Sequence, residues 1–555
     1  NKLAGTGGAQ FATATTAVGY KSLEALTTGA NNTAVGYETA KHNATGGLNT
    51  WVGYQAGTGA SGQSNSQNTG LGYRAGYSIT TGGNNTLLGR QTGLLLEGGD
   101  DNTFVGMNAG SATTSGTKMV SIGNQSMMAN VTTAANGTIA IGYEALTALT
   151  SAGTVLGIGY QALKALTTGA SNHAIGYQSQ AANVDGVANV SFGRGTLGGN
   201  VSGNHNTAIG HQALETFNNN VDAYNTAVGM NNLQAITTGI YNTSVGALVL
   251  DAASFGESFN TAIGFAAMTS VNEGAHASAQ ADHNVAVGYN ALEGGAFAGN
   301  PVVFTGNIAI GSLALDGTGA NAQTGTIAIG YEALTALTGS SSSGTVAIGY
   351  QSMEALTAGD GNTAVGYQTL YSVVNSNRNT AVGYQALYNQ NSTGFGYNVA
   401  LGYGTADAIT TGTHNTALGS LSLSAAQAAT GCVAIGYAAM NNVVTSDADH
   451  TIAIGYGALN YLTTGPGNIA IGYQAMLLHT TGGYNTVIGY QAMDDTDAGD
   501  TSRASTHNVF IGYSSGGGTW TNAQSNYNVG VGSFTLDAAL EGALDNTTVG
   551  YAGLT

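Results

Sequence analysis

The 555-residue sequence contains little charge, almost no proline and one cysteine. Lys, Arg, Asp and Glu together account for 7% of the residues, and proline occurs twice. Runs of Lys or Arg are absent, which argues against a nucleic-acid partner because such binding depends on cations that neutralise phosphates. No stretch of about 18 apolar residues occurs, so we expect no membrane insertion by this segment. Cys432 cannot form an intrachain disulfide and fits no metal or redox motif, so we expect a buried structural thiol.

Glycine is abundant, at 88 residues, but the composition does not indicate collagen or disorder. The sequence has no Gly-X-Y period, and collagen also requires much more proline. Hydrophobic residues make up 42% of the chain and recur at fixed positions, so their burial can offset the entropy lost on ordering. The net charge of −18 is spread thinly over a surface of neutral polar groups. Such a surface should depend little on ionic strength.

One short repeat runs from end to end and is clearest around a glycine, here called the motif glycine. It occurs 30 times between Gly19 and Gly550, most often 17 residues apart. The best copies read Asn-Thr-Ala-Val-Gly-Tyr. They supply the structural repeat positions Asn32, Val35, Gly36 and Tyr37 in one copy and Asn379, Val382, Gly383 and Tyr384 in another. Periods of this length indicate a solenoid, so we predict a single continuous array of about 30 coils over residues 1–555.

The residues before the motif glycine predict a β-strand. In one copy Ile139, Ile141 and Tyr143 alternate with Ala140 and Gly142, and β-branched and aromatic residues at a period of two favour strands. Both faces of this strand are apolar or small, which is typical of strands covered on both sides. A narrow solenoid buries only one face, so the other face predicts a partner and therefore an oligomer.

Two further positions complete the repeat. Asn lies four residues before the motif glycine in 22 of the 30 copies and should form a stacked column, because Asn suits turns and its side chains form ladders. After the strand, segments such as residues 161–169 carry leucines three apart, which fits either a helical turn or a second, bent strand. Thr-Thr-Gly then indicates a turn into the next coil. The fold class is therefore an all-β repeat β-solenoid.

The units Asn-Thr-Ala-Val-Gly-Tyr-Gln-Ala-Leu (379–387) and Asn-Ile-Ala-Ile-Gly-Tyr-Gln-Ala-Met (468–476) resemble the YadA-like head repeats of trimeric autotransporter adhesins. They are equally similar to related repeats in phage tail fibres, and the resemblance covers essentially the entire chain. It implies a left-handed parallel β-roll, a homotrimer with intertwined or side-by-side chains, and a role in attachment. The implied location is extracellular, on a cell surface or a virion surface.

Irregular coils with longer loops are expected at 265–311 and 490–532. Extra residues in a solenoid coil bulge outward, often on a binding face, although tolerated surface insertions look the same. The first region supplies the candidate contacts to a host receptor or glycan: His276, Asp282, His283, Phe297, Asn300 and Phe304. The second contains Asp494, Asp495, Asp497 and Asp500, whose spacing matches no calcium-binding loop and is interpreted as a solvated acidic loop.

No arrangement of residues in the sequence indicates catalysis, a cofactor or a metal site, and we predict that the protein is not an enzyme. Five histidines, His205, His283, His414, His450 and His507, lie five residues before a motif glycine and are expected in an outer turn. The favoured function is a structural and adhesive fibre. One alternative is the subunit of a self-assembling filament, since no amphipathic cap is recognisable at either end. An ice-binding solenoid is disfavoured because Thr-Thr-Gly occurs in a minority of coils.

Overall fold

A computed structural model of the chain describes residues 12–272, 280–295, 302–319, 321–338, 343–443, 446–496, 504–520 and 523–554. Within these residues the protein is all-β, as predicted. The only helices there are the short 3₁₀ turns η1 (Thr133–Ala135), η2 (Asp316–Thr318) and η3 (Ser446–Ala448). No helix in this part of the chain is long and apolar enough to cross a membrane. The chain divides into two compact units, residues 1–266 and 267–555.

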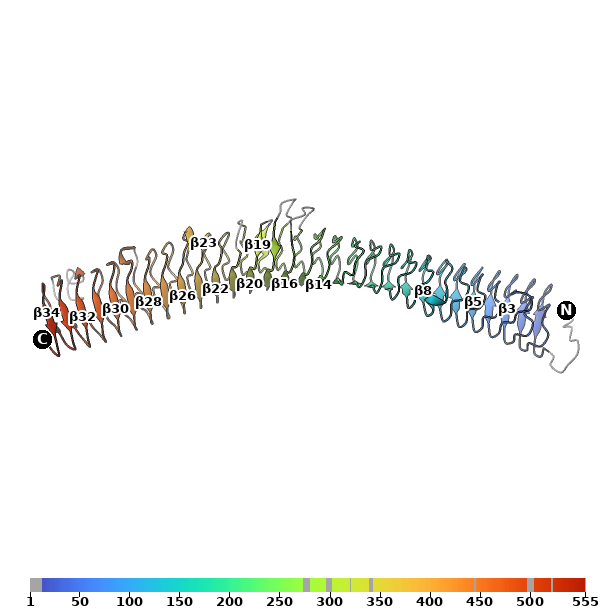
Figure 1. Cartoon of the computed structure of the whole chain (residues 1–555), viewed down its shortest axis with the longest axis horizontal. Coiled ribbons are helices and arrows are strands. Elements are labelled where there is room, and N and C mark those ends of the chain that lie inside the picture. Colours follow the sequence, from blue (N-terminus) through green and yellow to red (C-terminus); the bar gives the residue numbers. More distant parts are fainter. Residues whose placement is uncertain are drawn as a thin grey trace. The chain divides into compact units, whose positions relative to one another are not determined.

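The first unit is a parallel β-solenoid in which each coil contributes one three-residue strand (Figure 1). Neighbouring strands pair in parallel at equivalent repeat positions, for example Thr33 with Thr50 and Val35 with Val52. The strands are β1 (Thr16–Val18), β2 (Thr33–Val35), β3 (Thr50–Val52), β4 (Thr69–Leu71), β5 (Thr86–Leu88), β6 (Thr103–Val105), β7 (Val120–Ile122), β8 (Ile139–Ile141), β9 (Leu156–Ile158), β10 (His173–Ile175), β11 (Val190–Phe192), β12 (Thr207–Ile209), β13 (Thr226–Val228), β14 (Thr243–Val245) and β15 (Thr261–Ile263).

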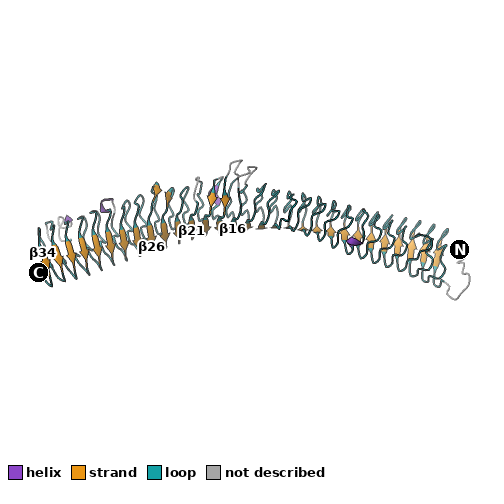
Figure 2. Ribbon diagram, viewed as in Figure 1, coloured by secondary structure: helices purple, strands orange, loops and turns teal. Residues whose placement is uncertain are grey.

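The second unit repeats this architecture, with its main-sheet strands along one side of the coils (Figure 2). Its main-sheet strands are β16 (Val285–Val287), β18 (Ile308–Ile310), β20 (Ile327–Ile329), β21 (Val346–Ile348), β22 (Thr363–Val365), β24 (Thr380–Val382), β26 (Val399–Leu401), β27 (Thr416–Leu418), β28 (Val433–Ile435), β29 (Ile452–Ile454), β30 (Ile469–Ile471), β31 (Thr486–Ile488), β32 (Val509–Ile511), β33 (Val529–Val531) and β34 (Thr547–Val549). Two small parallel pairs accompany it: β17 (Phe304–Thr305) with β19 (Gln323–Thr324), and β23 (Ser376–Asn377) with β25 (Gly394–Phe395).

Register is independent of coil length. Val285 of β16 pairs with Ile308 of β18, and Thr486 of β31 pairs with Val509 of β32, although each pair is separated by 23 residues. The longer coils therefore keep the register of the main sheet. Each unit carries the predicted repeat throughout its described residues. That a single array continues across the boundary at residues 266 and 267 stays a prediction.

The centre of each strand points into the solenoid. Ala140, Ala174 and Ala208 are completely buried there, whereas Ile139 and Ile141 on either side of Ala140 are only half-buried and point outward. Leucines four and seven residues after the motif glycine, such as Leu146 and Leu149, fill the interior opposite the strand. The small residue of the sequence pattern therefore faces the core, and the large β-branched residues face away from it.

Side-chain sizes within a coil are complementary. Where the central strand residue is large, the position four residues after the motif glycine is glycine: Trp51 is paired with Gly57, and Phe104 with Gly110. A Cβ atom added at Gly57 would lie 2.3 Å from the indole of Trp51, and one added at Gly110 would lie 2.5 Å from the Phe104 ring. The two positions therefore share one volume, which close packing keeps filled.

The Asn positions form a buried column, as predicted. Asn85 Nδ2 donates to Asn68 Oδ1 at 3.0 Å, and Asn102 Nδ2 donates to Asn85 Oδ1 at 3.0 Å. Where Asn residues follow one another, the backbone N–H also donates to the preceding Asn side chain, for example Asn102 N to Asn85 Oδ1 at 3.0 Å. The second Nδ2 hydrogen reaches a backbone carbonyl of the next coil, at Gly116 for Asn102. These bonds satisfy polar groups that would be costly to bury alone.

The segment after the strand is neither of the two structures that the leucine spacing suggested. Gln161 and Leu163 both have left-handed backbone, with φ of +54° and +51°, and equivalent residues in most coils do the same. Backbone bonds still join successive coils here, with Leu163 N donating to Ser179 O at 3.0 Å. This segment, residues 161–169 and their equivalents in other coils, is here called the stacked turn. Its left-handed backbone costs about 1–2 kcal/mol per residue. Core burial of Leu163 offsets this penalty.

The motif glycine allows the coils to stack closely. Gly366 has φ of +140°, which L side chains rarely adopt. A Cβ atom added there would lie 2.2 Å from the carbonyl oxygen of Gly383, the motif glycine of the next coil. Both the backbone conformation and the contact therefore require glycine.

Candidate interaction surfaces

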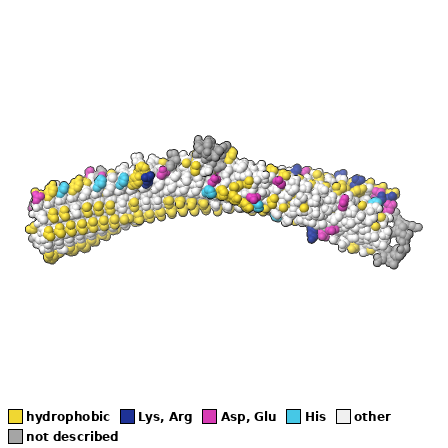
Figure 3. All heavy atoms as spheres, viewed as in Figure 1, with side chains coloured by type: hydrophobic (Ala, Val, Ile, Leu, Met, Phe, Trp, Pro, Cys, Tyr) yellow, Lys and Arg dark blue, Asp and Glu magenta, His cyan; other side chains and the backbone are white. Residues whose placement is uncertain are grey.

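The outer sheet face consists of the first and third side chains of every main-sheet strand. The third residue is apolar in all 30 copies, and the first is Thr, Val, Ile or Leu in nearly all of them. Ile310, Ile488 and Ile511 keep 36–39% of their surface exposed. In Figure 3 hydrophobic side chains of the second unit form continuous rows that run from one coil to the next. Parallel sheets are normally covered on both faces, and large exposed apolar patches mark interaction sites.

A column of tyrosines borders the outer sheet face. Tyr331, Tyr350 and Tyr367 stack with ring centroids 5.3 Å apart, and the column continues in the same way through Tyr384 and Tyr403. Each of these rings keeps about two fifths or more of its surface exposed. Because the ring faces cover one another, a partner would meet the ring edges and phenol hydroxyls rather than the faces.

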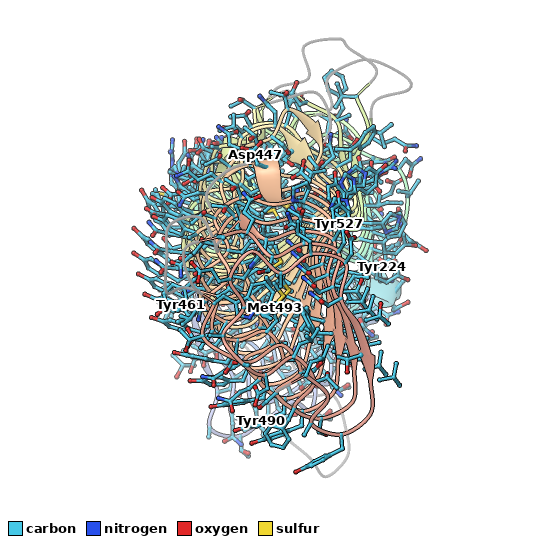
Figure 4. All side chains as sticks on the ribbon, turned by 90° about the vertical axis from the view of Figure 1, so that its left-hand side faces the viewer. Tyr224, Asp447, Tyr461, Tyr490, Met493 and Tyr527 are labelled. Carbon is cyan, nitrogen blue, oxygen red and sulfur yellow. The ribbon has the colours of Figure 1, made fainter. Side chains whose placement is uncertain are left out.

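The labelled side chains of Figure 4, which looks along the stacked coils, place these features around the outline of the coils of the second unit. Met493 lies in the interior, Tyr490 of the tyrosine column lies at the lower tip, and Tyr461 lies on the side away from the strands. Tyr461 belongs to the stacked turn, six residues after Gly455. The stacked turn and the outer sheet face are therefore on different sides of the coil.

The five histidines lie in the predicted outer turn. All have left-handed backbone, with φ between +58° and +61° for His205, His283, His414, His450 and His507. Several stack on aromatic rings at the same repeat position in adjacent coils: the centroid of His205 is 4.7 Å from that of Tyr224, and His507 is 5.2 Å from Tyr484. His205 Nδ1 also lies 3.3 Å from Asp222 Oδ1. In the described part of the chain, no three His, Cys, Asp or Glu side chains converge as a metal site would require.

The candidate receptor-contact residues separate into three groups. His283 is exposed and Asp282 is half-buried, so both reach the surface. Phe304 is completely buried in β17, where its N–H donates to Gln280 O at 2.8 Å. The sequence placed Phe304 on a projecting loop, but a short strand draws its ring into the core, so the ring is not part of the exposed surface. His276, Phe297 and Asn300 lie outside the described residues.

The second insertion holds two acidic residues within the described part, Asp494 and Asp495, while Asp497 and Asp500 lie outside it. Burial, together with the neighbouring charges of Asp495 and Asp537, raises the pKa of Asp494 to about 6. Asp495 Oδ2 accepts a hydrogen bond from Thr519 Oγ1 at 2.8 Å. Asp494 is therefore partly buried at the edge of this insertion and is not a fully solvated carboxylate.

Two titratable residues are core components. Cys432 occupies an Asn-column position, where its N–H donates to Asn415 Oδ1 at 2.9 Å, and burial raises the pKa of its thiol to about 11. Its predicted burial is confirmed. His479, which sequence reasoning did not single out, replaces a core leucine, and its Nε2 lies 2.9 Å from Gly482 O. Burial lowers the pKa of His479 to about 4, so the imidazole is neutral.

No family model matches the chain, and no curated protein matches it.

Proposed function

We propose that this chain is a structural and adhesive fibre protein and that its outer sheet face packs against two further copies in a homotrimer. The uncovered outer sheet face is the observation that carries the proposal, because it repeats in every coil of both units. The threefold symmetry, the left-handed β-roll and the role in attachment follow the resemblance to YadA-like head repeats and phage tail fibres. The proposed location is a cell surface or a virion surface.

The size of the outer sheet face favours a stable assembly. Completely burying a Val, Ile or Leu side chain contributes roughly 1.5–3 kcal/mol, so covering two half-buried side chains contributes about 1–2 kcal/mol per coil. Association costs about 4–15 kcal/mol, so one or two coils could not hold chains together. The 15 main-sheet strands of one unit, β1 to β15, supply on the order of 20 kcal/mol, which exceeds this cost.

Sedimentation velocity tests the assembly. The expected result is an elongated particle near three times the chain mass of 55.2 kDa. Replacing Ile141 and Ile158, third residues of β8 and β9, with lysine should weaken association, because two charges would then be buried in the interface. The control replaces Ser151 and Thr168 with lysine; both are exposed in the same coils but lie off the sheet face.

A monomer of 55.2 kDa at micromolar concentration would contradict the trimer. Unchanged association of the Ile141→Lys, Ile158→Lys variant would show that another surface holds the chains together. Particles that lengthen with concentration beyond three chains would favour the filament alternative. The attachment role is tested separately, by measuring the binding of sugars to the full chain.

A further inference from the structure

A notch interrupts the stacked turn of the first unit at residues 195–199. Gly195, Gly198 and Gly199 stand where the preceding coil has Gln178, Ala181 and Ala182. The missing side chains leave an open cavity of about 460 Å³, lined by these six residues and Glu215. A smaller pocket of about 60 Å³ shares Gln178, Gly195 and Glu215 and adds Tyr177, Arg194 and Gln212 to the lining.

The notch breaks a ladder of side-chain amides. In the second unit Gln368 Nε2 donates to Gln351 Oε1 at 2.9 Å, and Gln385 Nε2 donates to Gln368 Oε1 at 3.0 Å. In the first unit Gln178 Nε2 likewise donates to Gln161 Oε1 at 3.0 Å. The next ladder position is Gly195, so no glutamine follows to donate to Gln178 Oε1.

On the other side of the break, hydrogen bonds from side-chain amides hold the carboxylate of Glu215 in place. Position 195 is glycine, so Gln212 has no glutamine in the preceding coil to which it could donate. Its Nε2 lies instead 2.9 Å and 2.8 Å from the two oxygens of Glu215. Gln234 Nε2 donates to Glu215 Oε2 at 2.8 Å. Within the described residues no Lys, Arg or His forms an ion pair with Glu215. Glu215 is half-buried, so its charge is held in place by amides rather than by a cation.

Arg194 supplies the opposite charge in the smaller pocket, which shares Gln178, Gly195 and Glu215 with the larger cavity. Its guanidinium carbon lies 5.8 Å from the ring centroid of Tyr177, and its Nη1 lies 3.0 Å from His211 Nε2. The larger cavity thus presents an amide oxygen and a carboxylate beside the methyl groups of Ala181 and Ala182, and the smaller pocket, which shares Gln178 and Glu215 with it, adds the guanidinium. Glu215 would repel a phosphate, and Arg194 would repel a simple cation, so charged ligands of either sign are disfavoured.

We infer that this notch binds one neutral hexose in its pyranose form, as found at the end of a surface glycan. Each sugar hydroxyl both donates and accepts, so it can replace the missing glutamine by donating to Gln178 Oε1 or Glu215 and accepting from Arg194. The apolar C–H face of the ring fits against Ala181 and Ala182. Small-ligand sites typically combine an apolar wall with a few such polar groups.

The inference deepens the attachment part of the proposed function and rests on it. It does not require the trimer, although it is compatible with it. The notch belongs to the stacked turn, the side of the coil where Figure 4 shows Tyr461, away from the strands. Gly199 occupies the same repeat position as Tyr461, six residues after its motif glycine. Covering the outer sheet face would therefore leave the notch open.

Saturation-transfer NMR with the methyl glycosides of glucose, galactose and mannose tests the site on the full chain. We expect at least one sugar to bind, with a Kd of about 1 mM, typical of a small open site. The decisive variant is Gly195→Gln, which restores the ladder glutamine and fills the notch. It should fold normally, because Gly195 has φ of +67° while Gln178 and Gln212 adopt +53° and +56°. A Cβ atom added there has no contact shorter than 3.6 Å.

Gly195→Gln should weaken sugar binding by about tenfold or more, and Glu215→Gln should weaken it while preserving side-chain size. The matched control is Gly457→Gln, which adds the same side chain at the same repeat position of another coil, with no Cβ contact below 3.4 Å. The control should bind like the unmodified chain. Absence of binding for all three sugars, or undiminished binding by Gly195→Gln, would overturn the inference. Stronger binding of inorganic phosphate or spermidine than of any sugar would also overturn it.

Sedimentation of the same variants separates this inference from the proposed assembly. Loss of sugar binding with an unchanged particle mass supports the notch independently of the trimer. A trimer that binds no sugar would refute the notch and leave the assembly standing.

Discussion

The shared volume of Trp51 and Gly57 makes a quantitative prediction about the core. Trp51 is completely buried, and Cβ atoms added at Gly57, Gly70 or Gly76 would lie 2.3, 2.1 and 2.7 Å from its indole. Trp51→Ala should cost about 3–5 kcal/mol, since it removes a large buried side chain and leaves a cavity. Gly57→Leu alone should also destabilise, by about 1–3 kcal/mol or more, because leucine would enter occupied space.

The double variant Trp51→Ala, Gly57→Leu should be more stable than the sum of the two single-variant costs implies. It recreates the Ala and Leu pair found at Ala140 and Leu146, and Gly57 already has the left-handed φ of +59° that Leu146 adopts at +53°. We expect a total cost of about 2 kcal/mol and a coupling energy of at least about 2 kcal/mol, within the range for contacting residues. The change also removes the indole N–H, which has no hydrogen-bond partner among the described residues.

Hydrogen exchange followed by mass spectrometry should measure this effect locally, in the coils between residues 49 and 79. Local measurement is needed because the repeats of a solenoid do not unfold as one two-state unit. The control combines Trp51→Ala with Gly110→Leu, where the leucine would meet Phe104 instead of Trp51, so the two costs should add. Additive costs in the Trp51 and Gly57 variants as well would refute the shared-volume reasoning.

Three further predictions concern buried polar groups. Burial lowers the pKa of His479 from 6.5 to about 4, so below pH 6.5 the unfolded chain binds more protons than the folded chain. The free energy of unfolding should therefore be unaffected by His479 above pH 6.5 and should fall by about 3 kcal/mol by pH 4. Thermal melts from pH 7.5 to 4 should show this loss in the unmodified chain but not in His479→Leu, and equal pH profiles would contradict it. Asn379→Ala should cost about 1–3 kcal/mol, because the Asn398 N–H loses its acceptor, whereas Asn362 Oδ1 still accepts from the backbone N–H of residue 379. Asn379→Thr should cost less; exchange of the Asn398 amide would measure both costs, and equal costs would argue against the column. Cys432, with a thiol pKa of about 11, should react with iodoacetamide at pH 8 about a hundredfold more slowly in the folded chain than in urea, because the thiolate fraction falls by about that factor; rates within tenfold of each other would show that the thiol is accessible.

Sequence periodicity predicted the repeat, the strand before each motif glycine and the buried Asn column. These features depend on neighbours in the same coil or at the same position of the next coil, so a fixed spacing is sufficient to reveal them. The histidines in the outer turn were predicted for the same reason. They share the position of Tyr224 and Tyr484, just before the Asn column.

Other features were decided by packing across the coil. A period of two shows that Ala140 and Ile141 face opposite ways, but not which one enters the core; the narrow interior, already filled by leucines such as Leu146, accepts alanine. The left-handed turn at Leu163 was not predictable from leucine spacing, because its local penalty is offset only by tertiary burial. The same holds for Phe304, which looked like a loop residue until β17 buried it.

The sequence by itself therefore determined what repeats: strand, motif glycine, Asn column and the spacing between coils. Only the tertiary structure decided what departs from the repeat, including the burial of His479, the pairing of Trp51 with Gly57 and the notch at Gly195. The physical reason is that a departure acquires meaning from the side chains stacked above and below it. Those neighbours lie either across the same coil, as Gly57 does from Trp51, or 17 or more residues away in the next coil, and in both cases they are in direct contact in the solenoid.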